Sequence, residues 1–262
     1  MNKLIKNFFK QTNLWAGIAP IQLLGIYALY QIIVGATPSW WWIATIIGYI
    51  CLIMIGVSAG YHRLICHKGY KVHPWLRKIM LYFGTLAGQE SPIFWATVHR
   101  GYHHLHADKD QDPHSPQHGF FHSYIGWMFT LEDNLSPRYT IDLLRDPYCA
   151  FIHRHYHKIL WITYGIVALI NVDLCLYLLI LPAFIGLHTF GINTSFNHYR
   201  SIGYRNYNTP DNSVNSPWLF FLIFGEAWHN NHHGRPGDPK YGGRHWWELD
   251  PTYCFIKLVR ID

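Results

Sequence analysis

Histidines are the residues of this sequence whose spacing could do chemistry. The chain has 19 of them, and nine fall into three short boxes and one further position. The boxes read HRLICH, HRGYHH and HNNHH, and the further histidine lies in NHYR. The nine candidate metal ligands are His62, His67, His99, His103, His104, His198, His229, His232 and His233. Neutral imidazole binds iron, zinc, copper and nickel, so the pattern indicates a metal site.

Spacing within two of the boxes favours shared metal ions. Residues i, i+3 and i+4 lie on one face of an α-helix. We therefore expect His229 to point with His232 or His233 at a common centre, and His99 to do so with His103.

The first box and the number of histidines suggest more than one ion. His62 and His67 lie about 140° apart on an ideal helix, so we expect this pair to straddle a helix end or to serve two metals. Eight or nine imidazoles exceed the needs of one four-coordinate zinc. Carboxylate-bridged di-iron bundles need two ExxH motifs, and the only one here runs from Glu226 to His229. The sequence therefore predicts a two-metal site built almost entirely of histidine.

Long uncharged segments must position these boxes. Only 14% of the residues are charged, against roughly 25% in soluble domains. Residues 11–61 contain no charged side chain, and residues 159–199 contain only Asp173. A bilayer core of about 30 Å needs about 20 residues of helix. We predict an all-α integral membrane protein, one domain over residues 1–262, with four spans in two hairpins at about 14–36, 40–60, 152–170 and 174–196.

The remaining segments form the predicted polar part of the protein. A helical, histidine-rich cap is expected from residues 61–151 and 197–262. Residues 75–88 and 120–131 carry apolar side chains at mixed spacing, which favours helices along the membrane surface. Residues 133–148 and 206–217 are rich in Asn, Asp, Ser and Pro, and we expect loops there.

The distribution of Lys and Arg predicts the orientation. These residues occur near the N-terminus, between 62 and 158, and from Arg200 onward, while neither predicted hairpin turn contains one. The positive-inside rule places both termini and the cap in the cytosol. The net charge of +6 does not imply nucleic acid, since the basic residues lie beside hydrophobic segments. The five cysteines lack CxxC spacing, so no disulfide framework is expected.

The three boxes in this order, with GEAWHNNHH running into WWELDPTYCFIKLVR, resemble the membrane fatty-acid desaturase family, in particular its stearoyl-CoA and cyanobacterial acyl-lipid branch. The resemblance extends from about His62 to Arg260. It implies that the nine histidines bind two non-haem iron ions on the cytosolic side. It also implies an oxidoreductase that uses O2 to remove two hydrogens from an acyl chain in a narrow tunnel, introducing a cis double bond with Δ9 as a candidate position.

The second box departs from the family's usual HxxHH. Counting back from the DPH that follows aligns His103 and His104 with the last two histidines and places Arg100 where the first should be. The ligand is then expected to be His99, which a π-bulge could rotate into position. His106 is the alternative.

The family's NxxxH motif, whose asparagine holds a metal-bound water, is also shifted by one residue. Asn193 lies five residues before His198, and Thr194 occupies the expected offset. We choose Asn193 because TFGIN resembles the family's TWxxN pattern, with Phe190 in place of Trp. Thr194 and Asn197 remain alternatives.

By the same resemblance, Trp95, Thr189 and Phe190 line the bend of the acyl tunnel. The acyl-CoA branch often has Arg-Asp before its second box, whereas this chain has Thr97 and Val98. The fatty acyl substrate is therefore expected to be linked to CoA, to a lipid or to a carrier protein, with the CoA form weakened.

Further expectations concern partners and competing functions. No haem-binding HPGG segment or cysteine cluster is present, so electrons must come from a separate cytochrome b5-type protein or a ferredoxin with its reductase, whose acidic surface would suit the basic cap. Glu226 and Asp112 are candidates to orient ligand imidazoles. The alternative enzyme is a fatty acyl or alkane hydroxylase on the same scaffold. A membrane metal transporter is disfavoured, because the spans lack charged residues.

Overall fold

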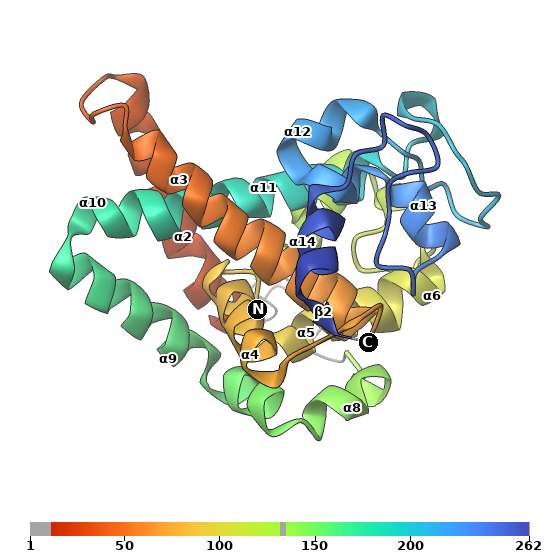
Figure 1. The fold of residues 1–262 in the computed structure, drawn as a ribbon, viewed down its shortest axis with the longest axis horizontal. Coiled ribbons are helices and arrows are strands. Elements are labelled where there is room, and N and C mark those ends of the chain that lie inside the picture. The colour runs from red at the N-terminus through yellow and green to blue at the C-terminus, as the bar shows by residue number, and fades with distance from the viewer. Residues whose placement is uncertain (1–11, 132–134, 262) are drawn as a thin grey trace, which may run out of the picture.

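Three long apolar helices dominate the computed structural model, which describes residues 12–131 and 135–261 (Figure 1). The first is α2 (Thr12–Ile33), and the second is α3 (Trp41–Tyr49) continuing as η1 (Ile50–Cys66). The third joins α10 (Val172–Leu174), η6 (Cys175–Ile180) and α11 (Leu181–Phe196). The segments Trp15–Ile33, Trp41–Cys66 and Val172–Phe196 are each long and apolar enough to cross a bilayer. A mainly helical membrane protein is therefore confirmed.

The predicted fourth span corresponds to α9 (Pro147–Ile170). This helix differs from the other three because its first half carries Arg154 and Lys158, and because His155 has non-helical angles (φ −117°, ψ 18°) that kink it. The four-span count and the two-hairpin arrangement stay predictions. Lys3, Lys6 and Lys10, which contribute to the predicted orientation, lie outside the described residues.

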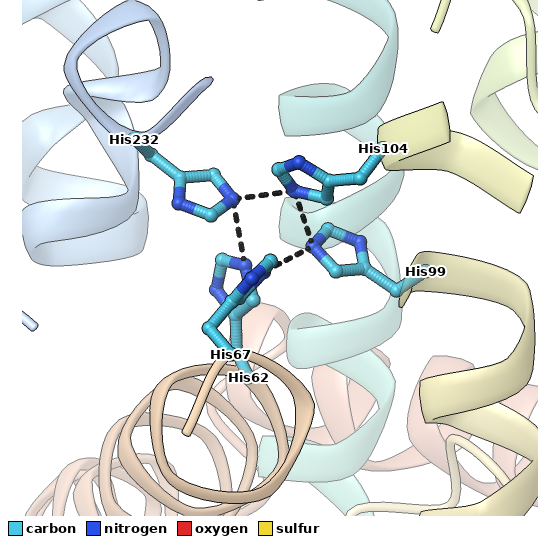
Figure 2. A group of neighbouring side chains, drawn as sticks. All are labelled: His62, His67, His99, His104 and His232. Atoms are coloured by element: carbon cyan, nitrogen blue, oxygen red, sulfur yellow. Dashed lines mark hydrogen bonds between the residues drawn. The ribbon is translucent and has the colours of Figure 1, made fainter. Parts of the chain in front are cut away.

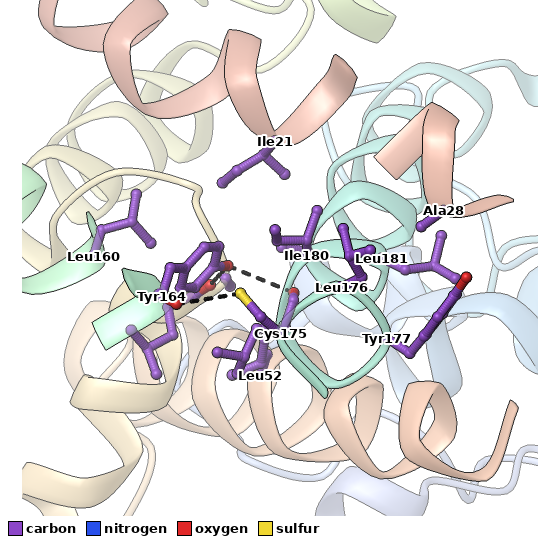
Figure 3. Packing of buried hydrophobic residues seen from close by; sticks show 14 of the residues in the cluster. Ile21, Ala28, Leu52, Leu160, Tyr164, Cys175, Leu176, Tyr177, Ile180 and Leu181 are labelled. Carbon is purple, nitrogen blue, oxygen red and sulfur yellow. Dashed lines mark hydrogen bonds between the residues drawn. The ribbon is translucent and has the colours of Figure 1, made fainter. Parts of the chain in front are cut away.

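The largest hydrophobic core lies where α2, α3, η1, α9, η6 and α11 meet (Figure 3). Polar groups inside it are paired: the Tyr164 hydroxyl donates to the Leu86 carbonyl at 2.6 Å, and Cys175 Sγ donates to the Tyr164 carbonyl at 3.3 Å. Helices α3 and η6 cross closely at Gly48, where an added Cβ would lie 2.0 Å from the Leu178 carbonyl oxygen. Glycine is therefore needed at this crossing.

Short helices and loops form the rest of the described chain. They are α4 (Pro74–Leu86), α5 (Pro92–Ala96), η2 (Thr97–His103), α6 (His104–His106), η3 (Pro116–His118), η4 (His122–Gly126), α7 (Trp127–Thr130), η5 (Pro137–Thr140), α8 (Ile141–Leu144), η7 (Arg200–Ile202), η8 (Pro217–Leu219), α12 (Phe220–Ile223), η9 (Phe224–Ala227), α13 (His229–Gly234) and α14 (Pro251–Val259). Strands β1 (Lys71–Val72) and β2 (Arg260–Ile261) pair antiparallel, a small exception to the all-α prediction.

Two of the short helices predicted from the sequence are present. Helices occur in both expected places, as α4 and as η4 with α7. The predicted loop at 133–148 is wrong in part, because η5, α8 and the start of α9 lie there. Prolines at the first positions of η5 and α9 explain the difference, since proline suits a helix N-terminus as well as a loop. The Asp146 carboxylate accepts hydrogen bonds from Tyr148 N and Cys149 N and so caps α9.

Candidate metal centre

Five histidines from all three boxes converge on one point (Figure 2). This five-histidine cluster consists of His62, His67, His99, His104 and His232, whose ligand nitrogens all lie within 4.8 Å of one another. Neighbouring Nε2 atoms are 2.8 to 3.1 Å apart along the chain of contacts from His67 to His62. Metal–nitrogen bonds of about 2.1 Å at right angles place two nitrogens about 3 Å apart. The spacing therefore fits donors around a single ion.

The other four candidate histidines form a second group beside the first. This four-histidine cluster consists of His103, His198, His229 and His233, again with ligand nitrogens within 4.8 Å of one another. Nε2 of His198 lies 3.0 Å from Nε2 of His229, and Nε2 of His103 lies 3.3 Å from Nε2 of His233. All nine sequence-predicted histidines thus fall into two groups, each large enough to hold one metal ion.

Helical turns wider than an α-turn explain the grouping. The His67 amide donates to the His62 carbonyl at 3.1 Å, and the His104 amide donates to the His99 carbonyl, both across five residues. Such π-turns bring i and i+5 toward one face. His62 and His67 therefore share a cluster at the end of η1, and the alternative that they serve two metals is not what the geometry favours.

The π-turn from His99 to His104 changes the histidine pairing that we expected in the second box. His99 shares the five-histidine cluster with His104, while His103 points into the four-histidine cluster. The predicted His99–His103 pair is wrong because it assumed α-helical spacing. His106 belongs to neither cluster.

In the third box, helix α13 serves both clusters. His229 and His233, an i, i+4 pair, have ring centroids 4.4 Å apart in the four-histidine cluster. His232 lies in the five-histidine cluster. One short helix thus links the two groups.

Carboxylates support four of the rings from behind. Oε2 of Glu226 lies 2.8 Å from Nδ1 of His62, and Oδ2 of Asp112 lies 2.8 Å from Nδ1 of His103. These two contacts agree with the expected orienting role. Two further pairs were missed from the sequence: Asp108 with His198 at 3.0 Å, and Asp211 with His233 at 2.8 Å. A carboxylate at Nδ1 fixes the ring and leaves Nε2 for a metal.

The electrostatics suit this arrangement. Burial alone would raise the pKa of the Glu226 carboxyl, but His62 and Arg63 outweigh it and lower the pKa to about 2. Burial and neighbouring imidazoles lower the pKa values of His99, His104, His229 and His232 well below the usual range. These rings are therefore neutral at pH 7, with a lone pair free to bind a metal.

Two arginines hold the boxes together. Arg63 is fully buried, donates to Glu226 and to both oxygens of Asp250, and lies 3.8 Å above the Tyr241 ring. It ties η1 to η9 and to the start of α14. Arg100 donates through Nε to the Cys66 carbonyl at 2.8 Å and contacts the Ile65 carbonyl at the end of η1. Arg100, which stands where the first histidine of the second box was expected, thus holds the second box against the first.

An apolar cavity reaches the histidines of both clusters. It encloses about 830 Å³ of empty space, its open mouth included. His62 and His99 of the first cluster, and His103 and His229 of the second, form part of its wall.

Two of the three predicted tunnel residues line this cavity. They are Trp95 and Phe190, and the Trp95 ring lies 4.9 Å from the His99 ring. Thr189 is not among the lining residues, and its hydroxyl pairs with the Tyr49 hydroxyl at 2.8 Å.

Two of the three candidates for the shifted asparagine motif, Asn193 and Thr194, line the cavity, whereas Asn197 does not. Asn193 is buried, and its side-chain oxygen accepts a hydrogen bond from Asn197. The Thr194 hydroxyl faces the carbonyls of Ser123 and Gly191. His114 is buried at the cavity wall with its Nδ1 3.4 Å from Asp112.

Comparison with known proteins agrees with these features. The sequence model of the fatty acid desaturase family matches residues 39–255. The chain is 36% identical to the sn-1 stearoyl-lipid 9-desaturase of Anabaena variabilis, covering 79% of this chain and 76% of that protein. It is 34% identical to the sn-2 palmitoyl-lipid 9-desaturase of Nostoc sp. (79% and 73%) and 31% identical to the acyl-CoA C20 Delta5-desaturase of Anemone leveillei (86% and 72%). The chain therefore belongs to the fatty acid desaturase family and is an oxidoreductase that acts on acyl lipids.

Proposed function

We propose that this protein is an O2-dependent acyl-lipid desaturase that uses two non-haem irons to introduce a cis double bond at Δ9. The observation that carries the proposal is the shared wall between the apolar cavity and both histidine clusters. A saturated chain in this cavity would lie directly against the two metal-binding groups. The curated relatives named as 9-desaturases support the position of the double bond.

The donor set fits two iron ions, one in each cluster. Iron bound there would supply the activation of O2 that side chains cannot provide. Removal of two hydrogens from the substrate releases two electrons, and the donor protein supplies two more, which together reduce one O2 to two waters. The nine imidazoles would hold the ions, and Asn193, which lines the cavity together with His103 and His229 of the four-histidine cluster, is the proposed holder of a metal-bound water.

The protein's own side chains would orient the substrate and exclude water. Trp95, Phe94, Trp127 and Phe190 give the cavity aromatic walls, which bind methylene chains without directional bonds. Because these walls are largely apolar, the chain can lie along the metal groups without competing water. The protein therefore contributes position and a low-polarity environment.

A lipid ester is the proposed form of the substrate. Among the described residues, no Lys or Arg lines the cavity, whereas the phosphates of CoA call for basic side chains. Thr97 is buried and hydrogen-bonded to the Ile93 carbonyl at 2.8 Å, so the pair that replaces Arg-Asp does not face a nucleotide. Two of the relatives reported above are named for lipid-linked substrates.

The orientation and the electron donor complete the proposal. The excess of Lys and Arg in the cap favours a cytosolic metal centre and cytosolic termini. A small acidic donor, either a cytochrome b5-type protein or a ferredoxin served by its reductase, would be attracted to the basic cap.

The test is expression in a desaturase-deficient host that keeps its own electron-transfer chain, followed by gas chromatography and mass spectrometry of the acyl chains of each lipid class. We expect a Δ9 double bond that is absent with His232→Ala and present with His106→Ala, since His106 lies outside both clusters. Hydroxylated chains would instead support the hydroxylase alternative. Purified protein without iron would contradict the di-iron proposal.

A further inference from the structure

One carboxyl group in the cavity wall has no role at the metal clusters. Among the described residues, two carboxylates line the cavity. One of them, Glu226, is paired with His62. The other is Glu90, in the connection between α4 and α5. The same cavity is also lined by Ile18, Met128 and Leu187, which pack together as a small apolar cluster. A carboxyl group in such surroundings needs a partner.

The backbone at Glu90 is strained. Its φ is +72°, in the left-handed region that residues with a side chain avoid. Gly88, two residues earlier, has φ +70° and adopts it without strain. The chain thus uses glycine at one left-handed position and a large acidic residue at the next. A strained residue in a cavity wall is typical of a functional position.

Neighbouring groups hold Glu90 in place. Its amide donates to the Tyr156 hydroxyl of α9 at 3.1 Å, and the Ser91 amide donates to its Oε2 at 3.3 Å. Burial raises the pKa of the Glu90 carboxyl to about 7, opposed by the Ser91 amide. Near neutral pH a large share of this carboxyl is therefore protonated, and a protonated carboxyl can donate a hydrogen bond.

The side chain next to Glu90 has a polar atom without a partner. Nε2 of Gln89 is buried without a hydrogen bond to any described residue, and Gln89 lines the same cavity. Two adjacent donors therefore interrupt an otherwise apolar part of the wall. The same cavity is also lined by candidate metal ligands, among them His99 and His229.

We infer that Glu90 binds the acyl carbonyl of an ester substrate and thereby fixes how far that carbonyl lies from the metal centre. This inference rests on the proposed desaturase function and names the group of the substrate that sets its position. Apolar walls hold a methylene chain but allow it to slide, whereas a few placed polar groups fix the orientation of a ligand. With the carbonyl bound at Glu90, the same methylene pair lies at the iron clusters in every turnover.

A binding experiment tests the inference without requiring turnover. The thermal midpoint of the purified full chain is measured in detergent alone, with methyl stearate, with octadecane and with stearoyl-CoA. For the unmodified protein we expect the methyl ester to raise the midpoint more than the alkane does. We expect stearoyl-CoA to give no larger shift than the methyl ester, and a larger one would overturn the ester assignment.

Three substitutions separate the side chain from the backbone. Glu90→Gln keeps a hydrogen-bond donor and should keep the difference between ester and alkane. Glu90→Leu should abolish it. Glu90→Gly should abolish it too, while raising the midpoint without ligand because the left-handed strain is relieved. Asp238→Asn, at a surface ion pair with Arg235, is the control. An unchanged difference with Glu90→Leu would overturn the inference.

Activity distinguishes failure of this inference from failure of the proposed function. With the unmodified protein we expect one double-bond position, and with Glu90→Leu a mixture of neighbouring positions. The KM should rise by up to about tenfold, the effect of one lost hydrogen bond, with a smaller change in kcat. A single unchanged position with Glu90→Leu would overturn the role of Glu90. If the unmodified protein forms no double bond, the desaturase proposal fails, and the thermal midpoints still decide whether Glu90 binds the ester.

Discussion

Glu226 places Oε2 2.8 Å from Nδ1 of His62, while its Oε1 accepts a hydrogen bond from Arg63 at 3.1 Å. One carboxylate therefore connects a candidate metal ligand to a buried cation. The two histidine clusters differ in how many of their rings face a carboxylate. The five-histidine cluster has this one carboxylate, whereas three of the four rings in the other cluster face an aspartate. A carboxylate at Nδ1 makes an imidazole a stronger metal ligand. The four-histidine cluster, which has fewer ligand nitrogens, therefore has more of its rings supported in this way.

Replacing Glu226 tests this connection. Glu226→Gln keeps the shape but removes the charge behind His62, so the imidazole becomes a weaker donor. We expect metal affinity at the five-histidine cluster to fall by about 10- to 100-fold. Iron retained after dialysis against a chelator, measured by mass spectrometry, reports the change. Asp146→Asn is the control because Asn also caps a helix, and iron retention equal to that of this control would contradict the prediction.

Iron content should also separate the two clusters. His67 and His233 belong to different clusters, so His67→Ala and His233→Ala should each lower the iron content from about two ions per chain toward one. The remaining ion has an intact set of ligands in each case. His106→Ala should keep both ions, because His106 belongs to neither cluster. Iron loss with His106→Ala that matches the loss with His67→Ala would instead favour His106 as a ligand.

Arg63 offers a prediction about stability. Its guanidinium is fully buried between Glu226 and Asp250. Arg63→Leu leaves two buried carboxylates without their cation, which typically costs about 3–5 kcal/mol. Denaturant unfolding of the metal-free protein in detergent measures this change in the free energy of unfolding.

A double variant checks the cause. If the cost comes from unpaired charge, then adding Asp250→Asn to Arg63→Leu should recover part of the lost stability, a coupling that a double-mutant cycle isolates. Additive losses would indicate that Arg63 acts through packing against Tyr241 instead.

The histidine sets could be predicted because their residue type and spacing are unusual, but their grouping could not. The misassigned pair, His99 with His103, follows from assuming 3.6 residues per turn. The shifted second box did suggest a π-bulge at His99, and a π-turn is present there, but the shift did not show that this turn places His104, rather than His103, beside His99. A shift of hydrogen bonding by one residue changes the face on which a side chain lies.

The supporting carboxylates were found from the sequence only in part. Glu226 and Asp112 lie close to a histidine box, whereas Asp211 lies in a loop 22 residues before His233. Loop conformation brings that pair together, and it leaves no periodic signal. The concentration of aspartates between Asp108 and Asp112 is the feature that could have directed attention to Asp108.

The pH dependence of stability should report on Glu90. Burial raises the pKa of its carboxyl from 4.5 to about 7 in the folded protein. Between these values the folded state binds more protons than the unfolded chain, so the free energy of unfolding falls as the pH rises through this interval. The loss is at most about 3 kcal/mol. Groups facing Glu90 are the hydroxyls of Tyr61 and Tyr156, and His153 through Ser91.

The Glu90→Gln variant isolates this contribution. Its amide does not titrate, so the other ionisable groups cancel in the difference between the two proteins. We expect the unmodified protein to lose stability relative to Glu90→Gln between pH 5 and pH 8, measured by denaturant unfolding at each pH. A difference that stays constant over this range would mean that the Glu90 carboxyl is already ionised at pH 5, and that water reaches it in the cavity wall. A falling difference would instead agree with a carboxyl that is protonated when it meets an ester carbonyl.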